Sequence, residues 1–290
     1  MDADLATCRR WFAEDLRLHS AMYGSDPWEA LPRQMIIDAF ATVPRERFFE
    51  PGPWRVMVGP RPDRAFTTPD ADPRWLYHDI LISIDPARGL NNGMPSLWAY
   101  YFDQLDLSPG AHVLQVGAGL GYYSAVLAEL VGRSGRVIAV EHDSGLAARA
   151  REHLASWPQV EVVAGDGRTH DAGAVDAIVV FAGSTHPAPS WLDRLAAGGR
   201  LLMPLTDANR WGFMLKVTRD GAALRAGSTG RLGIYPCAGG RDDAAAERLE
   251  RALAALGRDP VPVHTLHRGA PPPDAGDAVW YEGPGFWLER

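Results

Sequence analysis

The amino-acid sequence predicts a doubly wound α/β fold with a mostly parallel sheet, an N-terminal helical and irregular cap and a small C-terminal α+β extension. Two observations lead to this prediction. Short apolar runs rich in β-branched residues recur between residues 107 and 221, and segments of helical length separate them. Continuous apolar runs are typical of strands covered on both faces, and strands that alternate with helices form a parallel sheet.

The predicted core is built from five strands and three helices. The strands are expected at residues 112–116, 136–140, 160–163, 176–181 and 200–204. The helices are expected at residues 122–131, 146–156 and 189–196. In open sheets of this kind, ligands bind beyond the carboxyl ends of the strands, where the strand order reverses. We therefore expect functional residues directly after the strands.

The regions that flank the core are less regular. Three regions are predicted: an N-terminal substrate-side region at 1–106, the core at 107–236 and an extension at 237–290. The first contains expected helices at 3–22 and 32–42, then a Pro- and Gly-rich passage at 51–73 without strand or helix period. Beyond an expected strand at 231–236, the sequence predicts a helix at 242–256 and short strands at 261–266 and 278–289.

Composition narrows the functional classes. The chain has 290 residues, of which 46% are hydrophobic and 22% charged, so it is globular rather than disordered. Two cysteines exclude a disulfide scaffold, and the net charge of −7 disfavours nucleic acid and anionic membranes as partners. The N-terminus lacks the apolar stretch of a signal peptide, which predicts a cytoplasmic location. The histidines show no metal-ligand pairing, so no metal is expected, and the oligomeric state is left open.

A glycine-rich loop follows the first core strand. Gly117, Gly119 and Gly121 alternate with other residues and lead directly into the next helix. Glycines are needed there because a side chain would block the close approach of a cofactor to the backbone. Glu141 ends the second strand, twenty residues after the last glycine, where a carboxylate can accept hydrogen bonds from ribose hydroxyls.

The identity of the cofactor depends on the loop spacing. A dinucleotide fingerprint carries its third glycine at the sixth position, which is Tyr122 here. The observed spacing favours a nucleoside cofactor without a pyrophosphate, with S-adenosyl-L-methionine (SAM) as the leading candidate and a nicotinamide dinucleotide as the alternative. The third strand ends in Gly165, Asp166 and Gly167, and the Asp166 carboxylate can accept a hydrogen bond from an adenine amino group.

These motifs resemble those of class I SAM-dependent methyltransferases, and more narrowly of the protein-L-isoaspartate O-methyltransferase family. The resemblance rests on VPRERF (43–48), GxGxGY (117–122) and GDGR (165–168), and it extends over roughly two thirds of the chain. It implies a Rossmann-like core that binds SAM through Gly117, Gly119, Gly121, Glu141 and Asp166, and we expect Gly167 beside Asp166 to contact the cofactor as well. It also implies metal-free methylation of a carboxyl group on isoaspartyl residues of damaged proteins.

One segment departs from the family pattern. The family carries Thr-Ile-Ser-x-Pro before its first core strand, whereas this chain has Asn91-Asn92-Gly93-Met94-Pro95, so both hydroxyl positions are changed. We expect the amides of Asn91 and Asn92 to hold an acceptor carboxylate, although Asn-Asn-Gly is also strong turn chemistry. If the acceptor is a hydroxyl or an amine, a base is needed, and His186 after the fourth strand is the candidate.

The changed segment decides which function the sequence favours. The leading hypothesis is a SAM-dependent methyltransferase that O-methylates a carboxylate or hydroxyl on a small molecule or modified peptide in a biosynthetic pathway. The first alternative is isoaspartyl protein repair, and the second is a SAM-binding protein without turnover. An NAD-dependent oxidoreductase is a further alternative, but it does not explain GDGR.

Overall fold

The computed structural model describes residues 2–23, 31–58, 61–257 and 259–290. The chain forms two compact units. Unit 1 comprises Met1–Ala111 and Ala118–Ala164, and unit 2 comprises His112–Gly117 and Gly165–Arg290. The three predicted regions divide the chain differently and remain a prediction. None of the helices in the described part is both long and apolar enough to cross a membrane.

Unit 1 contains most of the helices. They are α1 (Asp2–Ser20), α2 (Gln34–Thr42), α3 (Pro95–Leu105), α4 (Tyr122–Val131) and α5 (Ser144–His153), with the short 3-10 helices η1 (Ala21–Tyr23), η2 (Arg45–Phe48) and η3 (Pro73–Leu76). Their boundaries follow from local chemistry. Pro95 begins α3, where its missing N–H costs nothing, and the Asp143 carboxylate caps α5 by accepting from Leu146 N–H at 2.9 Å. Gly121 precedes α4 at a φ of 93°.

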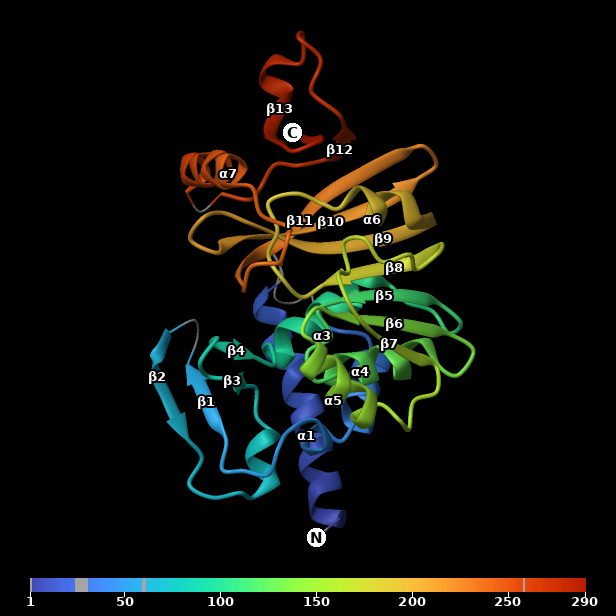
Figure 1. The fold of residues 1–290 in the computed structure, drawn as a ribbon, viewed down its shortest axis with the longest axis vertical. Coiled ribbons are helices and arrows are strands. Elements are labelled where there is room, and N and C mark those ends of the chain that lie inside the picture. The colour runs from blue at the N-terminus through green and yellow to red at the C-terminus, as the bar shows by residue number, and fades with distance from the viewer. Residues whose placement is uncertain (1, 24–30, 59–60, 258) are drawn as a thin grey trace. The chain divides into compact units, whose positions relative to one another are not determined.

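Unit 1 also contains two groups of strands. An antiparallel sheet has the order β2-β1-β3-β4, formed by Arg61–Thr67, Arg55–Val58, Leu81–Asp85 and Leu90–Asn91 (Figure 1). We expected no strand over residues 51–73, and this expectation is wrong, because β1 and β2 lie there. Trp54 and Val56 pack with Leu76 and Ile82 in a local core, and this distant packing outweighs the interruptions by proline and glycine. The other strands, β6 (Arg136–Glu141) and β7 (Val160–Ala164), pair in parallel.

Arg45 is a buried cation in the core of unit 1. Its side chain is 0% exposed, and its guanidinium donates to the carbonyl oxygens of Leu76, His78 and Ile80 at 2.6, 2.8 and 2.9 Å. The rings of Phe12, Phe49 and Tyr122 lie 5.5 to 6.0 Å from the guanidinium carbon. Arg45 of the motif VPRERF thus holds the segment that leads from η3 into β3.

Unit 2 is built on one sheet. Its strands are ordered β13-β14-β12-β11-β10-β9-β8-β5, and β5, β8 and β9 pair in parallel while the others pair antiparallel. The bounds are β5 (His112–Val116), β8 (Val175–Val180), β9 (Leu195–Thr206), β10 (Trp211–Asp220), β11 (Ala223–Gly233), β12 (Thr265–Arg268), β13 (Val279–Gly283) and β14 (Phe286–Glu289). The helices are α6 (Pro189–Arg194), α7 (Asp243–Leu256) and the short η4 (Gly276–Ala278).

The predicted fold class is confirmed. All five core strands and all three core helices are present, and each pairing described among those strands is parallel. The prediction omitted β10, because the turn before it carries neither glycine nor proline. Instead, Asp207 Oδ1 accepts from Asn209 N–H and Trp211 N–H, and Arg210 adopts a φ of 67°. The strand expected at 231–236 ends at Gly233 in β11.

Candidate functional site

The glycine loop in unit 1 has the backbone that its motif predicts. Gly119 and Gly121 have φ values of 57° and 93°, a region that favours glycine. A Cβ at Gly121 would lie 2.7 Å from Leu154 Cδ1, so helix α5 packs directly against the loop. Around Gly119 the nearest atom to such a Cβ is Ile84 Cδ1 at 3.9 Å, which leaves the backbone open there.

Glu141 is joined to this loop. Its carboxylate lies at the end of β6, where the residue is 9% exposed, and accepts from Gly119 N–H at 2.7 Å and from Asp143 N–H at 3.0 Å. A carboxylate has about four lone-pair sites, so two remain for further donors. The structure therefore brings two predicted cofactor residues together and leaves acceptors for the hydroxyls of a ribose.

The other predicted cofactor residues lie in unit 2. Gly117 has a φ of 87° at the end of β5, where a Cβ would lie 3.3 Å from Phe181 Cβ. A Cβ at Gly167 would lie 2.7 Å from Val116 Cγ1, so the Asp166–Gly167 turn packs against the same strand end. The exposed Asp166 accepts from Arg168 N–H at 2.8 Å. Within unit 2, three of the predicted residues thus gather at one edge of the sheet.

His186 is held by Arg168 rather than left as a free base. Arg168 Nη2 lies 2.9 Å from His186 Nε2, and a guanidinium can only donate, so Nε2 accepts. In the neutral ring, Nδ1 then carries the proton and donates to Thr185 Oγ1 at 3.0 Å. Burial, and then the charge of Arg168, lower the pKa of His186 below its ordinary value of 6.5. This geometry favours a positioning role for His186.

Residues beyond the predicted core complete this network. Thr185 Oγ1 accepts from Asp242 N–H at 3.0 Å, and its backbone carbonyl accepts from Tyr281 Oη–H at 3.0 Å. A Cβ at Gly240 would lie 2.6 Å from Ser184 Oγ and 3.1 Å from Arg168 Nη1. Only a glycine lets this segment approach so closely. The C-terminal extension therefore packs directly on the group around Arg168.

Asn91 and Asn92 form the turn that their sequence favours. Asn91 Oδ1 accepts from Gly93 N–H at 2.8 Å, and Asn92 Oδ1 accepts from Ile82 N–H at 2.6 Å. Both side-chain oxygens are therefore used locally. Asn92 Nδ2 is buried without a hydrogen-bond partner among the described residues. This nitrogen is the donor through which the predicted contact with an acceptor would be made, and that role stays a prediction.

Gly93 stands where the family pattern has serine, and the structure explains the change. Its φ is 80°, and a Cβ would lie 2.5 Å from Trp98 Nε1 and 3.4 Å from Tyr123 Cε2. Tyr123 Oη–H also donates to the Gly93 carbonyl at 2.9 Å. The buried Trp98 indole thus occupies the space that a side chain at position 93 needs.

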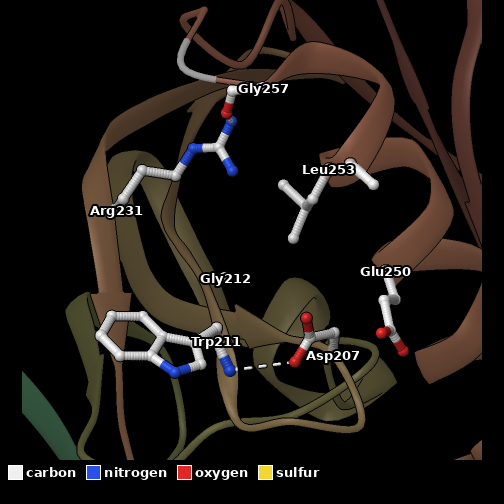
Figure 2. Close-up of a pocket in the computed structure, with 8 residues that line it drawn as sticks. Asp207, Trp211, Gly212, Arg231, Glu250, Leu253 and Gly257 are labelled. Carbon is white, nitrogen blue, oxygen red and sulfur yellow. Dashed lines mark hydrogen bonds between the residues drawn. The ribbon is translucent and has the colours of Figure 1, made fainter.

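A separate pocket of about 440 Å³ lies in unit 2, between the β10–β11 pair and α7. Figure 2 shows Trp211 and Arg231 on the strand side and Leu253 and Glu250 on α7. The Arg231 guanidinium points toward the Gly257 carbonyl, with which it makes a long hydrogen bond of 3.4 Å. None of the site residues predicted from the sequence lines this pocket. No group of three metal-ligating side chains gathers among the described residues, and the metal-free prediction stays a prediction.

Comparisons with known proteins agree with the motifs. The family model of protein-L-isoaspartate(D-aspartate) O-methyltransferase matches residues 62–231. Protein-L-isoaspartate O-methyltransferase 2 of Archaeoglobus fulgidus is 34% identical over 162 residues, which cover 54% of this chain and 73% of the relative. A relative from a Bradyrhizobium species, also called protein-L-isoaspartate O-methyltransferase, is 36% identical over 192 residues, which cover 65% of this chain and 78% of that protein.

Two solved structures share the fold. A protein-L-isoaspartate O-methyltransferase aligns with a TM-score of 0.62 at 20% identity, covering 96% of this chain and 87% of that one. A Plasmodium falciparum structure assigned to the same enzyme class, in complex with S-adenosyl-L-homocysteine, aligns with a TM-score of 0.61 at 16% identity, covering 79% and 97%. At these identities the alignments establish the fold. Together with the family model and the relatives, they show that the chain belongs to the protein-L-isoaspartate(D-aspartate) O-methyltransferase family, whose members are SAM-dependent methyltransferases.

Proposed function

We propose that this protein uses SAM to methylate the free carboxylate of an isoaspartyl residue in a peptide or protein. The family model supports this proposal most strongly, because the matched residues 62–231 include the changed Asn91–Gly93 segment as well as the cofactor motifs. The comparisons do not support the small-molecule acceptor that the sequence favours, and they agree better with the isoaspartyl alternative. A cytoplasmic location is part of the same proposal.

The residues present fit SAM. Loop glycines at positive φ leave room for the cofactor at the backbone, and Glu141 offers acceptors for ribose hydroxyls. We assign Gly117, Gly119 and Gly121 to the loop contact, Glu141 to the ribose, and Asp166 with Gly167 to the adenine. When bound, SAM would supply the methyl group of its sulfonium. A carboxylate oxygen would form the new O–CH₃ bond, and the electron pair of the broken S–CH₃ bond would stay on sulfur.

The proposed acceptor requires no general base. A carboxylate has an ordinary pKa of about 4, so it is already ionised at neutral pH and nucleophilic. The protein then has to bind and orient the acceptor, which can supply much of the rate. The His186 lone pair is engaged by Arg168, which agrees with chemistry that removes no proton. Asn92 Nδ2 stays the neutral donor that we assign to the acceptor, and because it is buried, a movement of the side chain must expose it first.

A paired peptide assay tests this function. The purified chain is incubated with labelled SAM and a peptide that contains either L-isoaspartate or ordinary L-aspartate at one position. We expect transfer to the isoaspartyl peptide and at most about a hundredth of that rate with the aspartyl twin. Equal transfer to both peptides, or transfer to neither, contradicts the proposal.

A substitution at Glu141 tests the cofactor assignment separately. Glu141→Gln removes the negative charge and replaces one acceptor oxygen with a donor, so we expect SAM affinity to fall about tenfold or more. Calorimetry with SAM measures the change. Glu161→Gln is the matched control, since Glu161 is exposed and pairs with Arg136 on the surface. Unchanged SAM affinity in Glu141→Gln overturns the ribose assignment.

A further inference from the structure

Arg168 carries a charge that no residue of the described chain neutralises. Its guanidinium makes one hydrogen bond to His186 Nε2 at 2.9 Å and one long bond to the His186 carbonyl at 3.4 Å. Both acceptors are neutral. The ring of Trp191 lies 5.4 Å from the guanidinium carbon, and a Cβ at Gly240 would lie 3.1 Å from Nη1. A partly buried cation without a counter-ion attracts anions, and its field is screened less than that of a fully exposed one.

The guanidinium also keeps donors available. A guanidinium has five N–H groups, and two bonds leave one N–H on each nitrogen. Arg168 is a partly exposed residue, and its Nε is not among the buried polar atoms that lack a partner. Two parallel N–H groups of a guanidinium match the two oxygens of a carboxylate.

The surroundings hold this side chain in one place. Trp191 Nε1–H donates to the Gly167 carbonyl at 2.8 Å and Ser190 Oγ–H donates to the Arg168 carbonyl at 2.5 Å, so α6 fixes the turn that carries Arg168. His186 is fixed in turn by Thr185, whose hydroxyl meets the backbone before α7. The group lies at the edge of unit 2 where Gly117 and Gly167 meet the end of β5. Preorganisation of this kind lowers the entropic cost of binding.

We propose that Arg168 binds the carboxylate that accepts the methyl group, and that His186 is the residue that positions it. This inference rests on the proposed function. A carboxylate substrate is ionised and pairs with Arg168, whereas the product ester is neutral and loses that attraction. The site therefore favours substrate over product, which promotes release after each turnover. The extension contributes through Gly240, whose missing side chain makes room for the guanidinium.

The test compares two ligands and two variants. The ligands are a peptide with one L-isoaspartyl residue and the same peptide with that carboxyl group converted to a primary amide. Arg168→Gln removes the charge but keeps a donor for His186, so it preserves the local structure better than Arg168→Ala. Calorimetry in the presence of S-adenosyl-L-homocysteine gives the Kd of each ligand, and initial rates give KM and kcat.

We expect wild-type protein to bind the acid at least about tenfold more tightly than the amide, and Arg168→Gln to bind the two equally. The KM for the isoaspartyl peptide should rise about 10- to 100-fold, with kcat changed less than about threefold and SAM affinity unchanged. Arg225→Ala, which removes an exposed arginine paired with Asp220, should leave every value as in wild type. Wild-type KM and wild-type discrimination in Arg168→Gln overturn the assignment.

His186 variants test the positioning role. His186→Ala should raise the KM for the peptide about three- to tenfold, and His186→Gln should restore most of it, because the amide oxygen can accept from Arg168. A purely structural role would lower Tm in both variants without changing the ratio of the acid Kd to the amide Kd.

The proposed function and the Arg168 assignment fail in different ways. Wild-type protein that binds the acid selectively but transfers no methyl group contradicts the proposed function, whereas active protein with unselective binding contradicts the Arg168 assignment.

Discussion

Arg45 and Arg168 both donate to neutral acceptors rather than to carboxylates, and their surroundings differ. Arg45 in unit 1 is 0% exposed and donates to three backbone carbonyls, while its buried Nε has no partner among the described residues. Arg168 in unit 2 is partly exposed, meets one imidazole and one distant carbonyl, and keeps donors available. The first arrangement stabilises a fold, and the second is suited to a ligand. Whether an arginine without a carboxylate partner stabilises the fold or binds a ligand can therefore be judged only after its remaining N–H donors are counted.

The largest effect is expected from removing Arg45. Arg45→Ala leaves three carbonyl oxygens without their donors in the interior, so we expect the free energy of unfolding to fall by about 3–5 kcal/mol. Urea denaturation followed by circular dichroism measures this change. Arg47→Ala in the same short helix is the control, since Arg47 is exposed and should change stability by less than about 0.5 kcal/mol. A loss below about 1 kcal/mol for Arg45→Ala would remove the distinction between the two arginines.

A smaller loss of stability, with a specific loss of cofactor binding, is expected at the loop. In Gly121→Ala the new Cβ meets Leu154 Cδ1 at 2.7 Å at a φ of 93°, which costs about 1–3 kcal/mol and displaces the loop. SAM affinity by calorimetry should fall at least about tenfold. Gly132→Ala is a matched control, because Gly132 has a φ of 66° but no atom within 4 Å of such a Cβ. If both variants bind SAM equally well, the loop is not the cofactor site.

Arg168 should contribute little to stability. Arg168→Gln loses the contact with Trp191 and part of the contact with His186, so the free energy of unfolding should change by about 1 kcal/mol or less. The same denaturation experiment measures it. A loss as large as that of Arg45→Ala would place Arg168 among the structural cations and weaken the case for a ligand.

The smallest effect is a pH dependence that passes through His186. The groups that face it are Arg168, Asp242 and Arg241, and burial followed by the charge of Arg168 lowers its pKa below 6.5. The folded protein thus favours the neutral form of His186. The contribution of this neutral form to the free energy of unfolding is complete above pH 6.5 and is lost as the pH falls through the lowered pKa. Protonated Nε2 can no longer accept from Arg168. We expect the peptide KM to be constant from about pH 6.5 to 8 and to rise a few-fold toward pH 5. His186→Gln should abolish that rise.

The sequence predicts the cofactor side better than the acceptor side. The five core strands and the glycine loop follow from local patterns, because the strands, the loop and the helix that follows it are close in sequence. The sheet β1–β4 could not be predicted in this way, since packing against Leu76 and Ile82 fixes it. The replacement of serine by Gly93 became understandable only with Trp98 in place, five residues further along.

The network around Arg168 was also hidden from the sequence. Arg168 stands in the GDGR motif, but its partners His186 and Gly240 lie eighteen and seventy-two residues away. Distant contacts of this kind depend on how the extension folds over unit 2, and no local pattern encodes them. The signal that was available is the arginine itself, a charged residue directly after a cofactor-binding turn.

The central claim is that the methylated group is a carboxylate, and the chemical stability of the product tests it most directly. The isoaspartyl peptide is methylated with labelled SAM, isolated, confirmed by mass to carry one added methyl group, and treated with mild base. We predict that the label is released as methanol and that the peptide returns to its original mass, because a methyl ester hydrolyses. A methyl group that survives the treatment is an ether or an amine, and it would contradict the account.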